Sequence, residues 1–392
     1  MKHALLSTAS ALLLAACGGG GGSPPPSPAP SPAPPPAPAP APPPASPPSV
    51  TTLRSDLANP WALARLPDGR WLLTERSGRL WLLSADARSK SELTGLPAVA
   101  SAGQGGLLDV AVDPDFAQAG SNHVYWSYAE PGSGGTAGTA VARATLGPAG
   151  LGAVQVIYRQ TPKVGGSGHF GSRLVFARDK TLFITLGERQ LGTPAQDPQQ
   201  ALGKVVRIRR DGSIPADNPV WSPAALPGVW STGHRNPQGA ALHPDTGELW
   251  VSEHGPQGGD EMNIARAGAN FGWPLRSYGC DYGAPVGDAC RIGGGVHAPA
   301  YTEPLTYWVP TSIAPSNHVF HSGTMFPEWR GQVLMGSLAG TALWRLVLDG
   351  NTVVGRERLL GELGERIRDV DEAPDGALWL LTDSGKLLRY GR

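Results

Sequence analysis

The stretch LPDGRWLLTERSGRLWLL, residues 66–83, contains the pattern that decides the fold of this chain. A turn built on Pro67, Asp68 and Gly69 is followed by a short apolar run, a polar turn and a second apolar run. Short runs rich in Trp, Leu and Val, bounded by Gly, Pro and Asp, are typical of β-strands and their turns. The stretch therefore predicts a pair of strands rather than a helix.

The same pattern recurs along the chain, at residues 107–128, 174–187, 240–253, 332–348 and 373–390. Imperfect repeats of this size are typical of a β-propeller, in which each repeat is one four-stranded blade. Because one blade cannot bury both of its faces, neighbouring blades have to supply the hydrophobic core. We therefore predict an all-β, six-bladed propeller over residues 49–392, with long loops on one face. A pair of β-sandwiches is the alternative, and the single continuous array of repeats argues against it.

The segment before the propeller is expected to direct the chain out of the cytoplasm. Residues 1–16 have a basic start and an apolar run that is too short for a permanent membrane span, as in a signal peptide. The run ends in Leu-Ala-Ala-Cys, which resembles a lipobox, so we expect Cys17 to be lipidated. An ordinary signal peptide is the alternative. Residues 17–48 are rich in Gly, Pro and Ala and are predicted to form a disordered linker, because they hold too few apolar groups to offset the entropy of ordering.

Composition and cysteine use limit the partners and the compartment. The formal net charge is +0 and only 16% of the residues are charged, so nucleic acid is not an expected partner. Contact with a membrane is expected through the lipid anchor only. Cys280 and Cys290 lie ten residues apart and are predicted to form a disulfide, as in an oxidising compartment. We predict a lipoprotein on the periplasmic side of a bacterial membrane, and Gly18 after Cys17 favours the outer membrane.

The polar residues that could carry chemistry lie at strand ends and in glycine-rich loops, at residues 103–106, 168–171, 233–239, 253–261 and 366–369. Each segment alone is weak evidence, because a histidine in a glycine-rich loop is more often structural than catalytic. Together, in their order and spacing, they resemble the soluble pyrroloquinoline-quinone (PQQ) glucose dehydrogenases and aldose sugar dehydrogenases. The resemblance runs from about residue 59 to 388 and is most specific in HRNPQG, EHGPQGGDE and NFGWP, between residues 233 and 274. It implies a six-bladed propeller that uses PQQ and Ca²⁺.

The resemblance also implies roles for individual positions. His169 matches the general base of the family, and Glu188 matches a carboxylate that orients it. Quinone contacts and further lining positions match Gln104, Arg235, Asn236, Ser312, Arg366, Arg368 and Asp383. Backbone carbonyls of Gly255 and Pro256 match ligands of the catalytic calcium, and Glu261 with the carbonyl of Phe271 matches a second calcium site. One position departs from the pattern: Ala339 stands where the glucose dehydrogenases have a lysine, so either a neighbour supplies that cation or the quinone is held less tightly.

These residue types suit the oxidation of a sugar by a quinone. Arginine offers a rigid donor fork for the three carboxylates of PQQ, although each of the three arginines could instead form a surface or inter-blade salt bridge. Imidazole accepts a proton near neutral pH, and a carboxylate on its other nitrogen fixes the tautomer. Calcium prefers oxygen ligands and polarises a carbonyl as a Lewis acid. His234 and His254 are interpreted as structural or pocket-lining, and Trp308 is expected in a loop, where stacking on a sugar or the cofactor is one of two open possibilities.

We therefore predict a PQQ- and calcium-dependent aldose dehydrogenase that moves a hydride to the quinone and releases a lactone. Its expected partners are an aldose sugar and a periplasmic electron acceptor. Two alternatives stay open. The first is a calcium-dependent, lactonase-like hydrolase, which would need a carboxylate-rich central metal site and which the arginine pair around Ile367 disfavours. The second is a non-catalytic propeller that binds a glycan or a protein, which the departure at Ala339 leaves possible.

Overall fold

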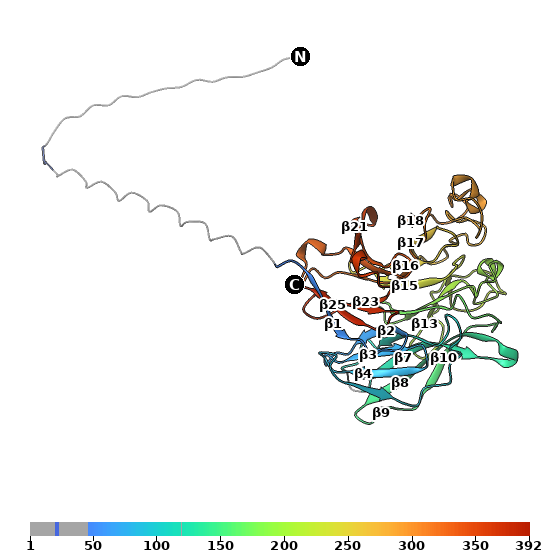
Figure 1. Cartoon of the computed structure of the whole chain (residues 1–392), viewed down its shortest axis with the longest axis horizontal. Coiled ribbons are helices and arrows are strands. Elements are labelled where there is room, and N and C mark those ends of the chain that lie inside the picture. The colour runs from blue at the N-terminus through green and yellow to red at the C-terminus, as the bar shows by residue number, and fades with distance from the viewer. Residues whose placement is uncertain (1–19, 23–45, 119) are drawn as a thin grey trace, which may run out of the picture. The chain divides into compact units, whose positions relative to one another are not determined.

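The computed structural model describes residues 20–22, 46–118 and 120–392, and Ser46–Arg392 form one compact unit. Predictions for residues 1–16, for Cys17 and for most of the linker lie outside the described residues. Within the compact unit the strands form six separate antiparallel sheets (Figure 1). No helix of the described ranges is long and apolar enough to cross a membrane.

The six sheets are the blades of a propeller, and each predicted repeat falls in a different one. The first three are β2 (Pro60–Arg65), β3 (Trp71–Glu75), β4 (Arg79–Leu83) and β5 (Lys90–Leu93); β6 (Leu107–Val112), β7 (His123–Pro131), β8 (Ala137–Gly147) and β10 (Gln155–Arg159), with β9 (Gly150–Leu151) beside β8; and β11 (Gly171–Phe176), β12 (Leu182–Leu186), β13 (Lys204–Ile208) and β14 (Val229–Ser231).

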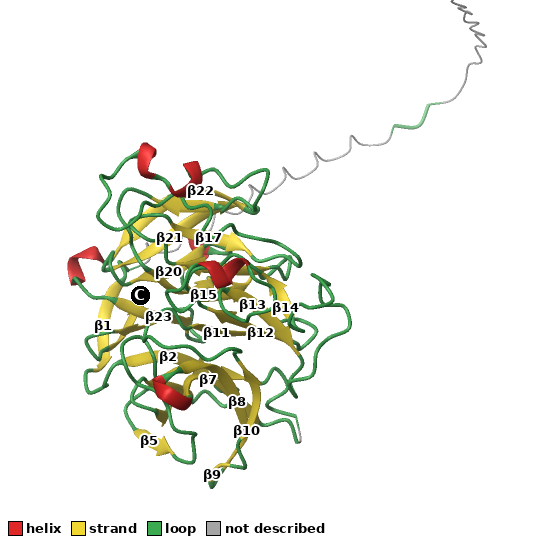
Figure 2. Ribbon diagram, turned by 90° about the vertical axis from the view of Figure 1, so that its right-hand side faces the viewer, coloured by secondary structure: helices red, strands yellow, loops and turns green. Residues whose placement is uncertain are grey.

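The remaining three sheets contain the second half of the chain. They are β15 (Pro237–Leu242), β16 (Leu249–Glu253), β17 (Asp260–Ile264) and β18 (Thr306–Trp308); β19 (Pro315–Phe320), β20 (Val333–Ser337), β21 (Ala342–Asp349) and β22 (Thr352–Leu359); and β23 (Ile367–Glu372), β24 (Leu378–Thr382) and β25 (Leu387–Gly391), completed by β1 (Ser49–Arg54). Short 3-10 helices lie in the connections, as Figure 2 shows: η1 (Ser133–Gly135), η2 (Thr193–Gln196), η3 (Asp288–Cys290), η4 (Ile292–Gly294), η5 (Pro327–Trp329) and η6 (Gly361–Leu363).

The ring is closed by pairing the two ends of the compact unit. Strand β1 pairs with β25, with Ser49 opposite Gly391, so the last blade takes its outer strand from the start of the propeller. The innermost strands β2, β6, β11, β15, β19 and β23 pack side by side in this order, and β23 packs against β2. The expectation of an all-β, six-bladed propeller is therefore confirmed.

Local sequence explains the strand pairs within each blade. At the turn of residues 66–69, the Leu66 amide donates to Arg70 O at 2.8 Å, and Gly69 has φ +92°, which a residue with a Cβ rarely adopts. The apolar run after the turn becomes β3, all five residues of which are buried. The turn chemistry read from the sequence therefore fixes where this hairpin begins.

The hydrophobic core lies between blades. Leu72 and Leu80 of the first sheet pack with Leu108 and Trp126 of the second. Trp71 stacks on Trp379 of the last sheet, with 4.4 Å between ring centroids. Because each blade buries its faces against its neighbours, stability depends on the closed ring rather than on any single sheet.

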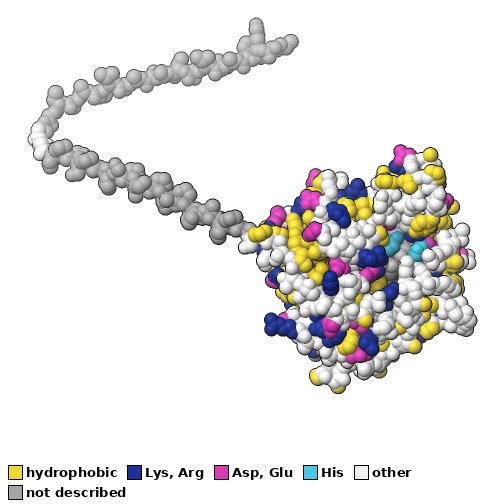
Figure 3. Space-filling model, viewed as in Figure 1, with side chains coloured by type: hydrophobic (Ala, Val, Ile, Leu, Met, Phe, Trp, Pro, Cys, Tyr) yellow, Lys and Arg dark blue, Asp and Glu magenta, His cyan; other side chains and the backbone are white. Residues whose placement is uncertain are grey.

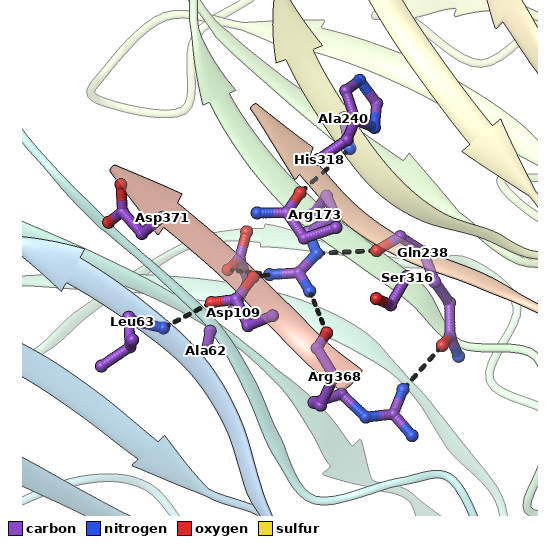
Figure 4. A network of polar contacts seen from close by, with 12 residues as sticks. Ala62, Leu63, Asp109, Arg173, Gln238, Ala240, Ser316, His318, Arg368 and Asp371 are labelled. Atoms are coloured by element: carbon purple, nitrogen blue, oxygen red, sulfur yellow. Dashed lines mark hydrogen bonds and ion pairs between the residues drawn. The ribbon is translucent and has the colours of Figure 1, made fainter. Parts of the chain in front are cut away.

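One guanidinium joins several blades at the centre of the ring (Figure 4). Arg173 of β11 is 2% exposed, and its Nη1 donates to the Asp109 carboxylate of β6 at 2.9 Å. Its Nε donates to Gln238 O of β15 at 2.7 Å, and its Nη2 donates to Arg368 O of β23 at 3.3 Å. Arg173 thus holds the backbone of two residues, Gln238 and Arg368, whose side chains bond to each other at 2.9 Å.

Two buried carboxylates complete this central network. Asp369 lies 3.2 Å from Arg173 Nη1 and accepts the Leu63 amide of β2 at 2.6 Å. Asp109 accepts the Leu174 amide at 2.7 Å. Burial raises the pKa of Asp109 to about 6 and also raises the pKa of Asp369, against the lowering effect of Arg173.

Candidate functional site

The starts of the innermost strands share a departure from regular pairing. Each has a register irregularity close to its first residue, between Pro60 and Ala62, Leu107 and Val110, Gly171 and Leu174, Pro237 and Gly239, Pro315 and His318, and Ile367 and Asp369. Bulges of this kind bend a strand and redirect side chains, and they are frequent beside active sites.

Residues at these irregular starts, together with residues that follow the second strands of the blades, line two adjoining cavities. One, of about 520 Å³, is lined by Gln104, His169, Arg235, His254, Gly255, Pro256, Asp260, Tyr282, Ser312 and Ala339, among others. The other, of about 380 Å³, is lined by Asn59, Trp61, Arg76, Gln238, Leu338, Arg366, Arg368 and Asp383, and shares Gln104, His254 and Ala314 with the first. On the face seen in Figure 3, histidine side chains are visible in a hollow beside basic and acidic groups. All six blades therefore contribute to one end of the ring.

His169 and Glu188 form a buried pair at the larger cavity. His169 Nδ1 lies 2.8 Å from Glu188 Oε1, and the two residues are 6% and 1% exposed. A carboxylate at this distance favours the tautomer with the proton on Nδ1, which leaves the Nε2 lone pair free. Burial lowers the pKa of His169, so the ring is neutral at pH 7. The pair has the arrangement that a general base requires.

The backbone around His169 is fixed by neighbours that the sequence also singled out. The His169 amide donates to Gln104 Oε1 at 2.8 Å. Asn236 is fully buried and accepts the Gly171 amide at 3.1 Å, so it lies behind the base and lines neither cavity. Gln104 thus both lines the cavities and positions the loop, whereas Asn236 supports the loop from within.

Arg235 is a buried cation without an acidic partner among the described residues. It is 6% exposed, and its guanidinium bonds to His254 O and to the Tyr282 hydroxyl, both at 3.2 Å. Its Nε is buried without a hydrogen-bond partner. Leaving a buried charge and a buried donor unsatisfied is unfavourable, so this position calls for an anionic or strongly accepting ligand.

Arg366 and Arg368 line the second cavity and share one carboxylate. Arg366 Nε donates to Asp383 at 2.9 Å and Arg368 Nε at 3.0 Å. Across both cavities the charged lining groups are four arginines, Arg76 included, against Asp260 and Asp383, and the neutral histidines do not change this excess. Asp383 therefore aligns the two guanidinium groups, and the surplus of positive charge favours a polyanion.

The loop of residues 255–260 is shaped by one buried carboxylate. Asp260 accepts amides of Gly255, Ile313 and Ala314 at 2.8, 2.5 and 2.8 Å. Burial raises the pKa of Asp260 to about 6. Ser312 Oγ donates to Pro256 O at 3.2 Å. In the part of the chain that the structure describes, no group of three or more His, Cys, Asp or Glu side chains is arranged to hold a metal ion, so a cation at this loop would rely on backbone carbonyl oxygens.

Glu261 and Phe271 meet at a small third cavity that shares Arg235, His254 and Gly255 with the first. Both line it, together with Glu253 and Arg235. Burial, and then the neighbouring Glu253, raise the pKa of Glu261 well above its ordinary value. Two buried carboxyl groups this close disfavour each other's ionised form, and a bound calcium ion would stabilise the ionised carboxylates.

The structure separates the three remaining aromatic candidates. His234 is fully buried between Glu253 and Ser231, at 2.8 Å from each, and is structural. His254 lines both cavities, its Nε2 lies 2.9 Å from Pro315 O, and burial lowers its pKa to about 3. The placement of Trp308 in a loop was wrong: it ends β18, is 5% exposed and packs in the core with Met335.

Several lining residues were missed from the sequence. Arg76 follows β3, just as Asp383 follows β24, so the register of the repeats could have identified it. Tyr282 lies in the loop closed by the Cys280–Cys290 disulfide, which is present as expected, and no sequence pattern pointed to it. Ala339 does face the larger cavity, where it offers no cation.

Comparisons with known proteins agree with this geometry. The family model for glucose/sorbosone dehydrogenases matches residues 57–389. Aldose sugar dehydrogenase YliI of Escherichia coli is 41% identical over 348 residues, which are 87% of this chain and 92% of that protein. A solved glucose dehydrogenase is 47% identical with a TM-score of 0.82, over 88% of this chain and 99% of that one. The PQQ-bound aldose sugar dehydrogenase of Streptomyces coelicolor is 31% identical with a TM-score of 0.71, over 88% and 98%.

Proposed function

The chain belongs to the glucose/sorbosone dehydrogenase family of oxidoreductases, and we propose that it oxidises aldose sugars to lactones with PQQ and Ca²⁺ held at the two cavities. The PQQ-bound relative supports the cofactor, and the sugar dehydrogenases among the relatives support the substrate class.

The observation that carries the proposal is the state of Arg235. Its guanidinium is buried, makes no ion pair within the described ranges and leaves Nε without a partner. It lines the same cavity as His169, and the adjoining cavity adds Arg366 and Arg368. A flat tri-acid would satisfy these donors, whereas a neutral sugar alone would leave the charges uncompensated.

The residues present fit both cofactors. Arg235, Arg366 and Arg368 would hold carboxylates of PQQ, and the carbonyls of Gly255 and Pro256 would hold calcium. When bound, the pair would supply an electron-poor quinone carbon whose carbonyl is polarised by the cation. Arg76 also lines the second cavity and is a candidate for the positive charge that Ala339 lacks.

His169 would take the proton of the anomeric hydroxyl on Nε2, since Nδ1 faces Glu188. Glu188 would then stabilise the imidazolium across 2.8 Å. The anomeric C–H would leave as hydride, so the sugar would lose two electrons and two hydrogens and become the lactone, with the bound quinone supplying the two-electron acceptor. Positioned general-base catalysis of this kind contributes roughly 10²–10⁴-fold.

Reconstitution tests the proposal directly. Purified protein is stripped with a chelator, loaded with PQQ and Ca²⁺, and assayed for dye reduction with a panel of aldoses. We expect sugar-dependent reduction that requires both additions. Bound PQQ without turnover on any aldose would refute the substrate class, and the absence of PQQ binding would refute the cofactor and favour a hydrolase or a binding module.

We further propose that the mature chain is an exported lipoprotein anchored through Cys17. The sequence before residue 17 and the Cys280–Cys290 disulfide support this, because disulfides persist in oxidising compartments. Metabolic labelling with a fatty acid should tag the wild type but not Cys17→Ser. Equal labelling of both, or of neither, would contradict the anchor.

A further inference from the structure

The backbone that carries His169 has a conformation that side chains rarely adopt. His169 has φ +51° and Ser172 has φ +94°. On the neighbouring segment, Arg189 and Gln190 have φ +61° and +64°. Residues with a Cβ persist in this region only when their surroundings determine the conformation, and such strain concentrates at functional sites.

Arg189 determines that conformation from behind the site. Its Nε donates to Gly168 O at 2.8 Å, its Nη2 to Gly166 O at 2.5 Å and its Nη1 to Ala137 O at 2.6 Å. Its own amide donates to His169 O at 3.2 Å. The guanidinium also lies over the Phe170 ring, 3.7 Å from its centroid. The Arg189 side chain therefore contacts residues that precede His169 and the residue that follows it.

The guanidinium of Arg189 is committed entirely to the backbone around His169. It is 1% exposed, all three of its guanidinium nitrogens bond to backbone carbonyls rather than to a carboxylate, and burial lowers its pKa to about 10. It lines neither cavity, so it touches neither substrate nor cofactor. Gly187 allows the segment that carries Arg189 to lie close to His169, because a Cβ at position 187 would collide with His169 O.

We infer that Arg189 is a positioning residue for His169, which it holds at the angle where Nδ1 meets Glu188 and Nε2 faces the cavity. The inference rests on the proposed function only in assigning His169 the proton. Four charged or titratable groups act on His169: Glu188, Arg235, Arg189 and His254. The Glu188 hydrogen bond raises the pKa of His169 more than the Arg189 charge lowers it, so loosening the contact between His169 and Glu188 lowers the pKa of His169.

The test compares Arg189→Met and Arg189→Lys with Arg207→Met as the matched control. Arg207 is 6% exposed on β13 and bonds to Thr181, Asn218 and Asp179, away from both cavities. For Arg189→Met we expect kcat to fall roughly 10–100-fold at little change in KM, because a small misplacement of a catalytic group has effects of this size. We also expect the acid limb of the pH profile to move to lower pH, because His169 loses part of its contact with Glu188, and we expect Arg189→Lys to lose less activity.

Hydrogen exchange over residues 165–172 gives a readout that does not need turnover. It should accelerate in Arg189→Met and stay unchanged in Arg207→Met, since only the first removes the clamp. Unchanged exchange in folded Arg189→Met, or wild-type kcat and pH midpoint, would overturn the inference. If Arg189→Met does not fold, Arg189→Lys takes its place in the test. Hydrogen exchange and kcat at wild-type values in Arg189→Lys would then overturn the inference. If the reconstituted wild type itself does not turn over, the proposed function fails and the exchange result alone decides the role of Arg189.

Discussion

Replacing Arg173 by Met should destabilise the whole ring, because it removes the cation between two buried carboxylates. Asp109 and Asp369 lie at 2.9 and 3.2 Å from Arg173 Nη1, and the backbone carbonyls of Gln238 and Arg368 lose their donor as well. Breaking a buried ion pair by removing one partner costs about 3–5 kcal/mol. Protonation limits the cost at Asp109: burial already raises its pKa to about 6 in the wild type, so protonating it at pH 7 costs only about 1.4 kcal/mol.

The pH dependence of this loss follows from the same carboxyls. Without Arg173 both would be protonated in the folded state and ionised in the unfolded state, so the folded state binds more protons. A group with a raised folded pKa contributes stability at low pH and loses it as pH rises, by about 1.4 kcal/mol per pH unit. The deficit of Arg173→Met relative to the wild type should therefore shrink between pH 7 and pH 5.

Urea unfolding of the apoprotein, followed by far-ultraviolet circular dichroism, measures this difference. Fluorescence is less suitable, because Arg173 lies 4.1 Å from the centroid of the Trp61 ring. We expect the loss at pH 7 to be about 3–5 kcal/mol and the added change Asp109→Asn to recover part of it. A loss below about 1 kcal/mol, or the same loss at pH 5 and pH 7, would refute the reasoning.

Three predictions concern the site. His169→Gln should lower kcat roughly 10²–10⁴-fold while PQQ binding is kept; wild-type turnover would remove His169 from its role. In the wild type, kcat/KM should rise with pH to a midpoint below 6.5 and then level off, because burial lowers the pKa of a base that must be neutral; a midpoint above 6.5 would contradict this. Arg235→Met should weaken PQQ binding roughly 10–100-fold in an equilibrium titration, the range expected for a charge-assisted hydrogen bond, and unchanged affinity would place the carboxylates elsewhere.

The fold could be predicted because its signals are local. Turn residues such as those at 66–69, followed by short apolar runs, define the strand pairs, and the repetition of this pattern along the chain then implies a ring. The pairing of Ser49 with Gly391 joins the two ends of the compact unit, and the sequence of β1 alone does not identify β25 as its partner. Trp308 shows where local signals mislead. The nearby Pro310 suggested a loop, but Trp308 packs with Met335 in the core and ends a strand.

The site could be predicted where short motifs carried it, and not where it depends on contacts across blades. His169, Gln104 and Arg235 follow from glycine-rich segments and do line one cavity. Arg173 and Arg189 sit among ordinary residues of a strand and a turn, and a buried arginine there is indistinguishable in sequence from a solvated one. Their roles appear only when the carbonyls of distant segments, such as Ala137 and Arg368, are placed around them.

A crystal structure of the protein soaked with PQQ and Ca²⁺ is the most direct test of how the cofactor is held. The account predicts a planar ring across both cavities, its acid groups within hydrogen-bond distance of Arg235 and of the Arg366–Arg368 pair, with the cation against the carbonyls of Gly255 and Pro256. Density for the ring at any other surface, with the Arg235 guanidinium still unpaired, would contradict it.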